Sequence, residues 1–201
     1  GISPARLAAF EILWKIEKEK AFSSALLPIY ESQLNPIDRG LCHELTLGVL
    51  RKQLYLDKII AQFSNNKKLD LEIKIALRLG LYQLLLLDKI PAYSAINESV
   101  NLVVKSKKHS AKGFVNAILR RATREEIKLE FADEMDKISF ETSHPRWLLE
   151  KWIGQFGFEA AQKLAESNNE TPKLSYRFTA KTTESVKASL QRESIDNEQS
   201  F

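Results

Sequence analysis

Apolar side chains recur at helical spacing through most of the first 124 positions of the chain. After a Ser-Pro pair that suits a helix start, Leu7, Phe10 and Leu13 fall on one helical face. The most apolar segment, 69–87, has the pattern of a helix at the centre of a bundle. Pro28 leaves the start of the second helix open. Further helices are expected over roughly 23–34, 36–51, 54–63, 69–87, 93–105 and 110–124.

The pattern changes after residue 124. Acids and lysines alternate over 125–140, which predicts a linker or peripheral segment, and His144-Pro145 then opens a helix that Gly154 and Gly157 end. Another helix is expected over 158–167, followed by one strand at 173–180 and a last helix. A single strand cannot form a sheet alone. The sequence therefore predicts a mainly all-α chain, with a bundle of about seven helices in 1–130 and, in 141–201, the truncated start of an α+β subdomain.

Positive charge is concentrated in one segment. The chain has 30 Lys and Arg and 26 Asp and Glu, a formal net charge of only +4. Between positions 105 and 128, however, there are eight basic residues and two acids, so the rest of the chain sums to −2. Such a concentration can steer a polyanion, although a solvated helix face is the commoner origin of a charge run.

Few side chains are candidates for catalysis or metal binding. Cys42 is the only cysteine, so no intramolecular disulfide can form, and in an apolar helix it is expected to be a small core residue. The three histidines lack metal-ligand spacing. No apolar run approaches the ~20 residues that span a bilayer, and the first residues lack a signal-peptide layout. We expect a cytoplasmic protein with no membrane segment and no metal.

The segment KGFVNAILRR, at 112–121, is the main candidate for a binding site. A basic loop leads into its helix start, where phosphate groups are favoured. Phe114 shares an apolar stripe with Ile118, which favours a core position, but an aromatic in a first turn can also stack on an unpaired base. Asn116 could hydrogen-bond a base edge, and Arg120 and Arg121 could follow phosphates.

Several motifs resemble the NusB-like helical fold. This fold occurs in the antitermination factor NusB and in the N-terminal region of the bacterial 16S rRNA cytosine-5 methyltransferases. LRLGLYQLLLLDKIPAYSAINESVNLV at 77–103, followed by KGFVNAILRR, is similar to its signature, and PARLAAFEIL at 4–13 resembles its first helix. DRGLCHELTLGVLR at 38–51 resembles the third helix of the methyltransferases. SHPRWLLEKW at 143–152 and AESNNETPKLSYRFTAKTTESVKASL at 165–190 resemble the segment that leads into their methyltransferase domain.

The resemblance implies a chain of two parts. Residues 1–130 would dock the enzyme on small-subunit ribosomal RNA, and 141–201 would begin the methyltransferase region. In the family, S-adenosylmethionine and two catalytic cysteines belong to a Rossmann-like domain further along. No catalytic or cofactor-binding residue is therefore expected in this chain, and the missing C-terminal domain is an expected partner. Cys42 inherits no role, nor does Thr179, where the family often has asparagine.

The resemblance also extends the candidate RNA-binding set. In NusB the first-helix arginine and the entry of the KGFVN-like helix lie on the RNA side, which implies a partly exposed Phe114. Arg78, also at a family position, is interpreted as structural. The residues expected to contact RNA are Arg6, Lys105, Lys107, Lys108, Lys112, Phe114, Asn116, Arg120 and Arg121.

Three functions are compatible with these features. The first is the RNA-recognition portion of an rRNA cytosine-5 methyltransferase. The second is an antitermination factor that binds RNA with a protein partner, against which the residues from 143 onward argue. The third is a helical interaction module whose basic residues are only solvated.

Overall fold

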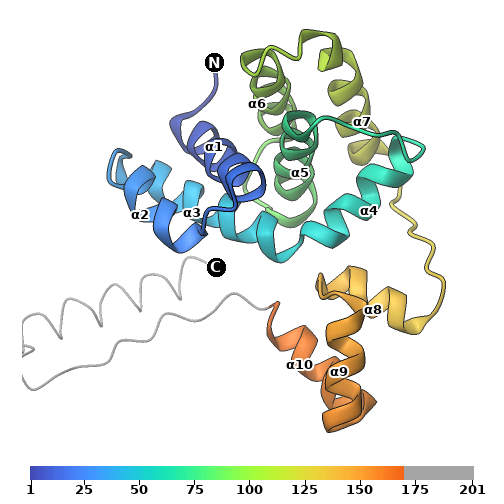
Figure 1. Cartoon of the computed structure of the whole chain (residues 1–201). Helices are drawn as coiled ribbons and strands as arrows, with labels where there is room; N and C mark the ends of the chain where they lie inside the picture. Colours follow the sequence, from blue (N-terminus) through green and yellow to red (C-terminus); the bar gives the residue numbers. More distant parts are fainter. Residues whose placement is uncertain (170–201) are drawn as a thin grey trace, which may run out of the picture. The chain divides into compact units, whose positions relative to one another are not determined.

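The computed structural model describes residues 1–169, and all the regular elements among them are helices (Figure 1). The first seven α-helices confirm the predicted bundle, and with them the mainly all-α fold class. The predicted strand at 173–180 and the helix after it lie outside the described residues, as does Thr179. The bundle helices are α1 (Pro4–Glu19), α2 (Ser23–Glu31), α3 (Pro36–Arg51), α4 (Gln53–Phe63), α5 (Leu71–Leu86), α6 (Ala92–Lys105) and α7 (Lys112–Arg124).

Local sequence signals account for several helix ends. In α3, Pro36 occupies the first turn, and the Asn35 side chain accepts a hydrogen bond from the Asp38 N–H at 2.9 Å. Pro28 lies inside α2, which starts at Ser23. Its ring nitrogen cannot bond to the carbonyl of Ser24, but Ser24 is exposed, so water can satisfy that carbonyl.

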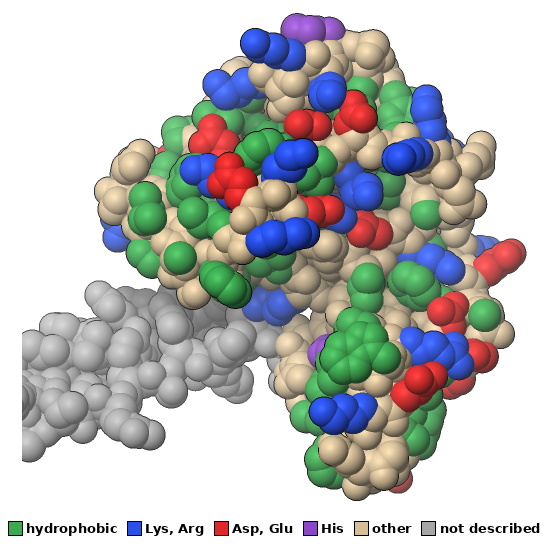
Figure 2. Space-filling view, in the orientation of Figure 1, with side chains coloured by type: hydrophobic (Ala, Val, Ile, Leu, Met, Phe, Trp, Pro, Cys, Tyr) green, Lys and Arg blue, Asp and Glu red, His purple; other side chains and the backbone are tan. Residues whose placement is uncertain are grey.

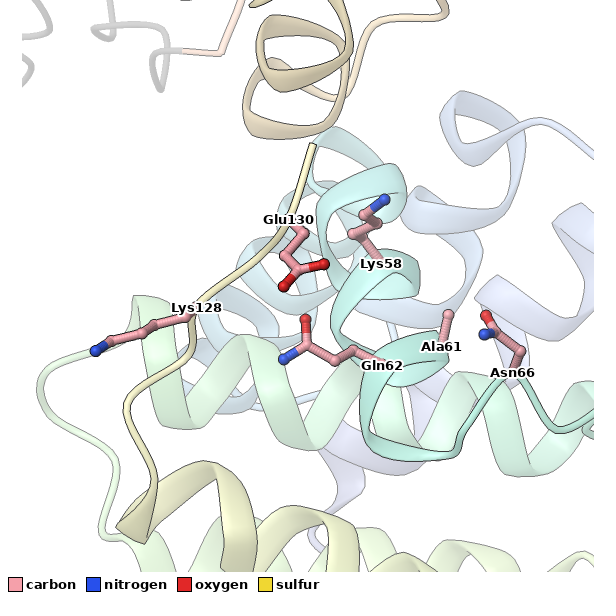
Figure 3. Close-up of a pocket in the computed structure, with 6 residues that line it drawn as sticks. All are labelled: Lys58, Ala61, Gln62, Asn66, Lys128 and Glu130. Atoms are coloured by element: carbon pink, nitrogen blue, oxygen red, sulfur yellow. The ribbon is translucent and has the colours of Figure 1, made fainter. Parts of the chain in front are cut away.

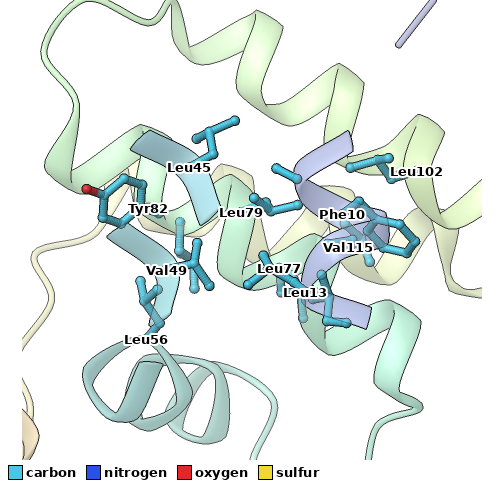
Figure 4. Close-up of a cluster of buried hydrophobic side chains, with 14 of the residues drawn as sticks. Phe10, Leu13, Leu45, Val49, Leu56, Leu77, Leu79, Tyr82, Leu102 and Val115 are labelled. Carbon is cyan, nitrogen blue, oxygen red and sulfur yellow. The ribbon is translucent and has the colours of Figure 1, made fainter. Parts of the chain in front are cut away.

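Helix α5 is the centre of the bundle. It contacts α1, α3, α4, α6 and α7, and Figure 1 shows it enclosed by its neighbours. Every residue from Ile75 to Gln83 is buried, which explains why this segment is apolar around most of its circumference. The side chains of Leu77, Leu79 and Tyr82 meet residues of α1 and α3 in the main core (Figure 4). The apolar run predicted from the sequence thus forms the inner helix.

Two arginines of the described residues are buried in the bundle, Arg6 and Arg78. The guanidinium of Arg78, on α5, donates two hydrogen bonds to the Asp57 carboxylate, at 2.7 and 2.8 Å. A third hydrogen bond, of 2.6 Å, reaches Glu17 on α1. Arg78 is only 3% exposed, so these carboxylates supply the pairing that a buried charge requires. The structural interpretation of Arg78 is confirmed.

Three further helices follow the bundle: α8 (Glu134–Thr142), α9 (Arg146–Phe156) and α10 (Phe158–Ser167). Helix α8 lies in the segment that the sequence marked only as linker or periphery, because its apolar periodicity is weak. Its start carries a readable signal, since the Asp133 side chain accepts a hydrogen bond from the Asp136 N–H at 2.7 Å. Gly157, at φ 83°, ends α9, whereas Gly154, also predicted to end it, lies inside that helix.

Helices α8–α10 enclose a small core of their own, formed by Ile138, Leu149 and Ala165. Helix α8 also packs against α4 of the bundle. The Lys58 ammonium on α4 lies 4.5 Å from the ring centre of Phe140 in α8, within the range of a cation–π contact. The expected domain limits at 130 and 141 stay predictions.

Candidate nucleic-acid interface

The predicted binding segment begins at an uncapped helix start. The connection from α6 reaches α7 through one 3-10 turn, η1 (His109–Ala111), and Figure 2 shows Lys and His side chains over this connection at the top of the view. Among residues 1–169 no side chain caps α7, and no acid lies in its first turn, so none of these residues neutralises the positive end of its dipole. A Cβ on Gly113 would meet nothing within 4 Å, so the backbone there is open to a ligand.

Phe114 has features of both positions that its spacing left open, a core position and an exposed one that can stack on a base. It packs against the main core, yet it is half-buried, so part of the ring faces outward. The ammonium of Lys67 lies 5.3 Å from the ring centre, a cation–π contact. A partly exposed aromatic ring beside a cation suits both a base, which stacks, and its phosphate, which pairs.

The loop between α4 and α5 contributes basic residues that sequence reasoning missed. The sequence SNNKK, at 64–68, places Lys67 over Phe114 and leaves Lys68 exposed beside it in the chain. Asp70, which follows, forms a 2.8 Å ion pair with Lys108 of the α6–α7 connection. The α4–α5 loop and the α6–α7 connection, which are distant in the sequence, thus meet at the start of α7. The adjacent lysines Lys67 and Lys68 could not reveal this contact from the sequence alone.

The basic residues in and beside the α6–α7 connection differ in whether they form an ion pair. Lys105, Lys107 and Lys112 are exposed and have no ion pair with any of residues 1–169. The Lys108 ammonium is paired with Asp70, and this pairing raises the pKa of Lys108 and lowers that of Asp70. We infer that Lys107 and Lys112 are freer to contact a phosphate than Lys108 is.

Two arginines of α7, Arg120 and Arg121, already have partners. Arg120 donates to the Asn116 side-chain oxygen at 3.1 Å. Arg121 makes two 2.9 Å hydrogen bonds to Glu125, which raise the pKa of the guanidinium, and it stacks 4.6 Å from the ring centre of Phe63. Because these pairs are exposed, they constrain the side chains weakly and a phosphate could displace Glu125.

Arg6 is not part of this cluster. It is 6% exposed, and its guanidinium donates to Gln83 at 2.6 Å and to Glu98 at 3.0 Å. Gln83 lies near the C-terminal end of α5, whereas the loop that carries Lys67 precedes its N-terminus. At ~1.5 Å per residue the two ends of α5 are roughly 20 Å apart. Contact between Arg6 and RNA stays a prediction, and it would require Arg6 to exchange its present partners.

Two hollows flank the C-terminal part of α4. The first, of about 420 Å³, is the α4–linker hollow, lined by Lys58, Gln62, Lys128 and Glu130. Figure 3 shows the Glu130 carboxylate beside Gln62, with the Lys128 ammonium pointing away. The second, of about 290 Å³, is the α4–α5 hollow. It is lined by Asp57, Ile60, Ala61, Ser64, Asn66, Lys67, Lys68, Leu69 and Lys74.

Other kinds of site find less support in the part of the chain that the structure describes. Cys42 is fully buried, and burial raises the pKa of its thiol to about 11, which confirms a core role. Within residues 1–169 no group of three or more His, Cys, Asp or Glu side chains could hold a metal ion. Nor does that part contain a helix long and apolar enough to cross a membrane.

The comparisons with known proteins agree with this architecture. The family model described as the NusB family matches residues 3–124, which include all seven bundle helices. The chain belongs to the NusB family. A second model, described as the Methyltr_RsmF/B-like, ferredoxin-like domain, matches residues 144–200. The NusB-family bundle is therefore followed in the same chain by a second family segment that begins at α9.

Curated relatives match most of the chain. The "Ribosomal RNA small subunit methyltransferase B" of Pseudomonas putida is 38% identical over 174 residues, covering 86% of this chain and 39% of the relative. The "Probable ribosomal RNA small subunit methyltransferase B" of Bacillus subtilis is 36% identical over 174 residues, covering 84% and 39%. The Pasteurella multocida relative, also named ribosomal RNA small subunit methyltransferase B, is 32% identical over 202 residues, covering 98% and 44%. The NusB-family chain thus spans about two fifths of these relatives.

Proposed function

We propose that this chain is the RNA-docking portion of an S-adenosylmethionine-dependent rRNA (cytosine-C5) methyltransferase that acts on small-subunit rRNA. The names of the relatives and the two family segments support this assignment. The observation that carries RNA docking is the entry of α7, where the half-buried Phe114 follows Lys107 and Lys112 in the chain, two exposed lysines with no ion pair in residues 1–169.

Each part of this entry would serve a different purpose. Lysines paired with phosphates supply affinity that does not depend on sequence and that falls with salt. The start of α7 adds a positive dipole end for one more phosphate. Phe114 supplies a ring on which an unpaired base can stack, which favours a loop or single strand over a duplex. The bundle would thus hold the RNA while another domain performs the chemistry.

The residues described do not fit a site for S-adenosylmethionine. They form helices and no strand, so they lack the strand, glycine loop and helix that hold nucleotides in Rossmann-like domains. We propose that residues outside 1–169 perform the methyl transfer. We propose the same division within the chain, with RNA docking in 1–130 and the start of the methyltransferase region in 141–201. The family matches to 3–124 and 144–200 support it.

The antitermination alternative is less well supported. It accounts for the NusB-family bundle, but it gives no role to the ferredoxin-like segment matched at 144–200. The alternative of a helical module without RNA differs in a measurable way, because its lysines would make no contact whose strength depends on salt.

RNA binding by the chain is the decisive test. Fluorescence anisotropy with a labelled small-subunit rRNA hairpin, at 50 and 200 mM salt, should give an affinity that falls as salt rises. Changing Lys107 and Lys112 to alanine should flatten the slope of log affinity against log salt by roughly 0.7 to 0.9 per lost contact. The control replaces Lys151 and Lys163, exposed lysines of α9 and α10, and so changes the net charge equally. No binding by the parent, or equal effects of the two double variants, would reject docking at α7.

The role of Phe114 needs a separate variant. Phe114→Leu keeps an apolar side chain against the core but removes the aromatic face. If a base stacks there, affinity for the hairpin should fall by about five- to tenfold or more, since one stacked base contributes ~1–3 kcal/mol. An unchanged affinity would leave Phe114 a core residue only.

A further inference from the structure

We propose that the α4–α5 hollow holds a phosphate group of the bound RNA, next to the nucleotide that contacts Phe114. This inference rests on the proposed RNA docking and extends it to a place that the basic run of 105–128 does not include. Three lysines line the hollow, Lys67 and Lys68 from the α4–α5 loop and Lys74 from the first turn of α5.

The charge inside the hollow is not neutralised. Lys68 and Lys74 have no ion pair with any residue of the described range 1–169. Among the described residues that line the hollow, Asp57 is the one carboxylate, and both of its oxygens accept hydrogen bonds from Arg78, at 2.7 and 2.8 Å. An entering phosphate would therefore meet three cations and a carboxylate that is already paired.

The neighbouring α4–linker hollow does not combine unpaired cations with a paired carboxylate. It is larger, at about 420 Å³, but Glu130 lines it and forms no ion pair within the described part of the chain. Of its cations, Lys128 is paired with Glu126 at 3.0 Å, and Figure 3 shows its ammonium directed away from the hollow. Lys58 lies against Phe140. Size alone would favour this hollow, whereas charge favours the smaller one.

Lys67 connects the α4–α5 hollow to the candidate interface. Its ammonium lies over the ring of Phe114, while the residue also lines the hollow. A base that stacks on Phe114 would share this ring with the Lys67 ammonium, and the proposed phosphate would lie on the hollow side of that lysine. The alternation of an aromatic ring with cations that follow the backbone is the arrangement that binds single-stranded nucleic acid.

The hollow has the size and polar groups that a phosphate requires. Its volume of about 290 Å³ is several times the ~30 Å³ that one water occupies in the liquid, so a phosphate and bound waters fit. Asn66 also lines it and carries a side-chain donor, whereas the hydroxyl of Ser64, another lining residue, donates to the Ala61 carbonyl at 3.4 Å. Ile60, Ala61 and Leu69 supply the apolar part of the wall.

The first test compares two double variants of the 201-residue chain. Lys68→Ala with Lys74→Ala should weaken binding of a labelled single-stranded 12-mer RNA about tenfold at 50 mM salt, and should reduce the salt slope by about 0.7, the value for one lost phosphate contact. The matched control is again Lys151→Ala with Lys163→Ala, which should bind like the parent. Lys67 is left intact because its removal would also alter the surroundings of Phe114.

The second test locates the phosphate. Each linkage of the 12-mer is replaced in turn by a neutral methylphosphonate, and affinity is measured for the parent and for the Lys68, Lys74 variant. At one or two linkages the methylphosphonate should weaken RNA binding by the parent about tenfold. At the same linkages it should not change binding by the variant, because the two changes remove the same contact. Inorganic phosphate, matched in ionic strength by chloride, should compete only weakly if the ligand is RNA.

Failure of this inference can be told apart from failure of the proposed function. If the Lys107, Lys112 variant weakens binding while the Lys68, Lys74 variant binds like the control, docking at α7 stands and the phosphate site is rejected. Additive losses at every linkage, or strong competition by inorganic phosphate, would also reject it. If the parent binds no RNA, both proposals fall.

Discussion

The bundle α1–α7 and the three helices α8–α10 are stabilised by cores of very different size. In the bundle one helix, α5, is buried along nine successive residues from Ile75 to Gln83 and is enclosed by five others. In the second region three residues, Ile138, Leu149 and Ala165, form the buried cluster. Since burial of apolar surface supplies most of the stability of a fold, the bundle should be much the more stable of the two.

The surfaces of the two regions do not differ in the same way as their cores. Trp147, Phe156 and Phe158 of α9 and α10 are 66%, 59% and 46% exposed. In the bundle part of the chain, Phe22, Ile37 and Tyr93 are 76%, 86% and 71% exposed. Both regions therefore keep large apolar side chains in water. The size of the buried core, and not the surface, indicates a bundle that folds on its own contacts and a segment that depends on its neighbours.

The largest expected effect is loss of a core side chain in the bundle. Leu79→Ala removes a fully buried side chain from α5 and leaves a cavity, so the free energy of unfolding should fall by ~2–5 kcal/mol. Urea unfolding followed by circular dichroism measures this. Leu86→Ala, at a residue 38% exposed near the end of the same helix, is the control and should cost much less. Equal losses at the two positions would contradict a core centred on α5.

The equivalent change in the smaller core should act locally. Leu149→Ala removes the largest buried side chain of that cluster, at 1% exposure, so α8–α10 should open while the bundle persists. Hydrogen exchange should accelerate by about tenfold or more in residues 134–167, as expected for a loss of ~1.4 kcal/mol or more in local stability. Exchange in α5 should stay that of the parent. Trp147→Ala, at an exposed position of α9, is the control, and global unfolding in the Leu149 variant would show that the two cores are one.

A close contact within the bundle gives a somewhat smaller effect. A Cβ on Gly48 of α3 would lie 2.1 Å from the ring of Tyr82, so Gly48→Ala must displace that ring and its hydrogen bond to Glu44. We expect a loss of ~1–3 kcal/mol. Gly40 in the same helix has nothing within 4 Å, and Gly40→Ala should stabilise by up to about 1 kcal/mol through helix propensity. A Gly48→Ala variant as stable as the parent would refute the close approach.

The smallest effect concerns pH and the second region. His144 is half-buried against Trp152, and burial lowers the pKa of its ring. The folded state therefore disfavours the protonated ring, so stability should fall as pH drops from 7.5 through 5.5. His144→Gln should reduce that fall by less than about 1 kcal/mol, since the ring is partly solvated.

Urea midpoints at the two pH values test this contribution. The exposed His109 provides the matched substitution, and His109→Gln should leave the parent's difference between the two pH values in place. A His144→Gln variant with the parent's full pH dependence would assign the effect to other groups.

Helix positions in the bundle could be predicted from the sequence because burial there follows one regular period. The expected 54–63 and 158–167 agree closely with α4 and α10, and the predicted inner segment 69–87 became α5. Helix α8 was missed because acids and lysines alternate through 125–140, so its apolar pattern is faint. Its cap, Asp133, was visible but carries little weight without a periodic run after it.

The candidate site was predictable only in part. The spacing within KGFVNAILRR could identify the entry of α7, since those residues are neighbours along one helix. It could not show that Lys67 lies over Phe114, because that contact joins residues 47 positions apart and depends on how α4, α5 and α7 pack. It also could not show that Arg6 is held by Gln83 and Glu98, a pairing set by the opposite end of α5.

The packing of α4 limits where this protein could be truncated. One side of α4 packs on α5, while α8 and the residues beside it cover another, through the contact of Lys58 with Phe140 and the hydrogen bond from the Tyr55 N–H to Ser143. A chain that stopped at Arg124 would therefore uncover part of α4 that is now protected. Such a shortened protein should keep its bundle but become less soluble, because the surface of α4 that α8 now covers would promote association between copies.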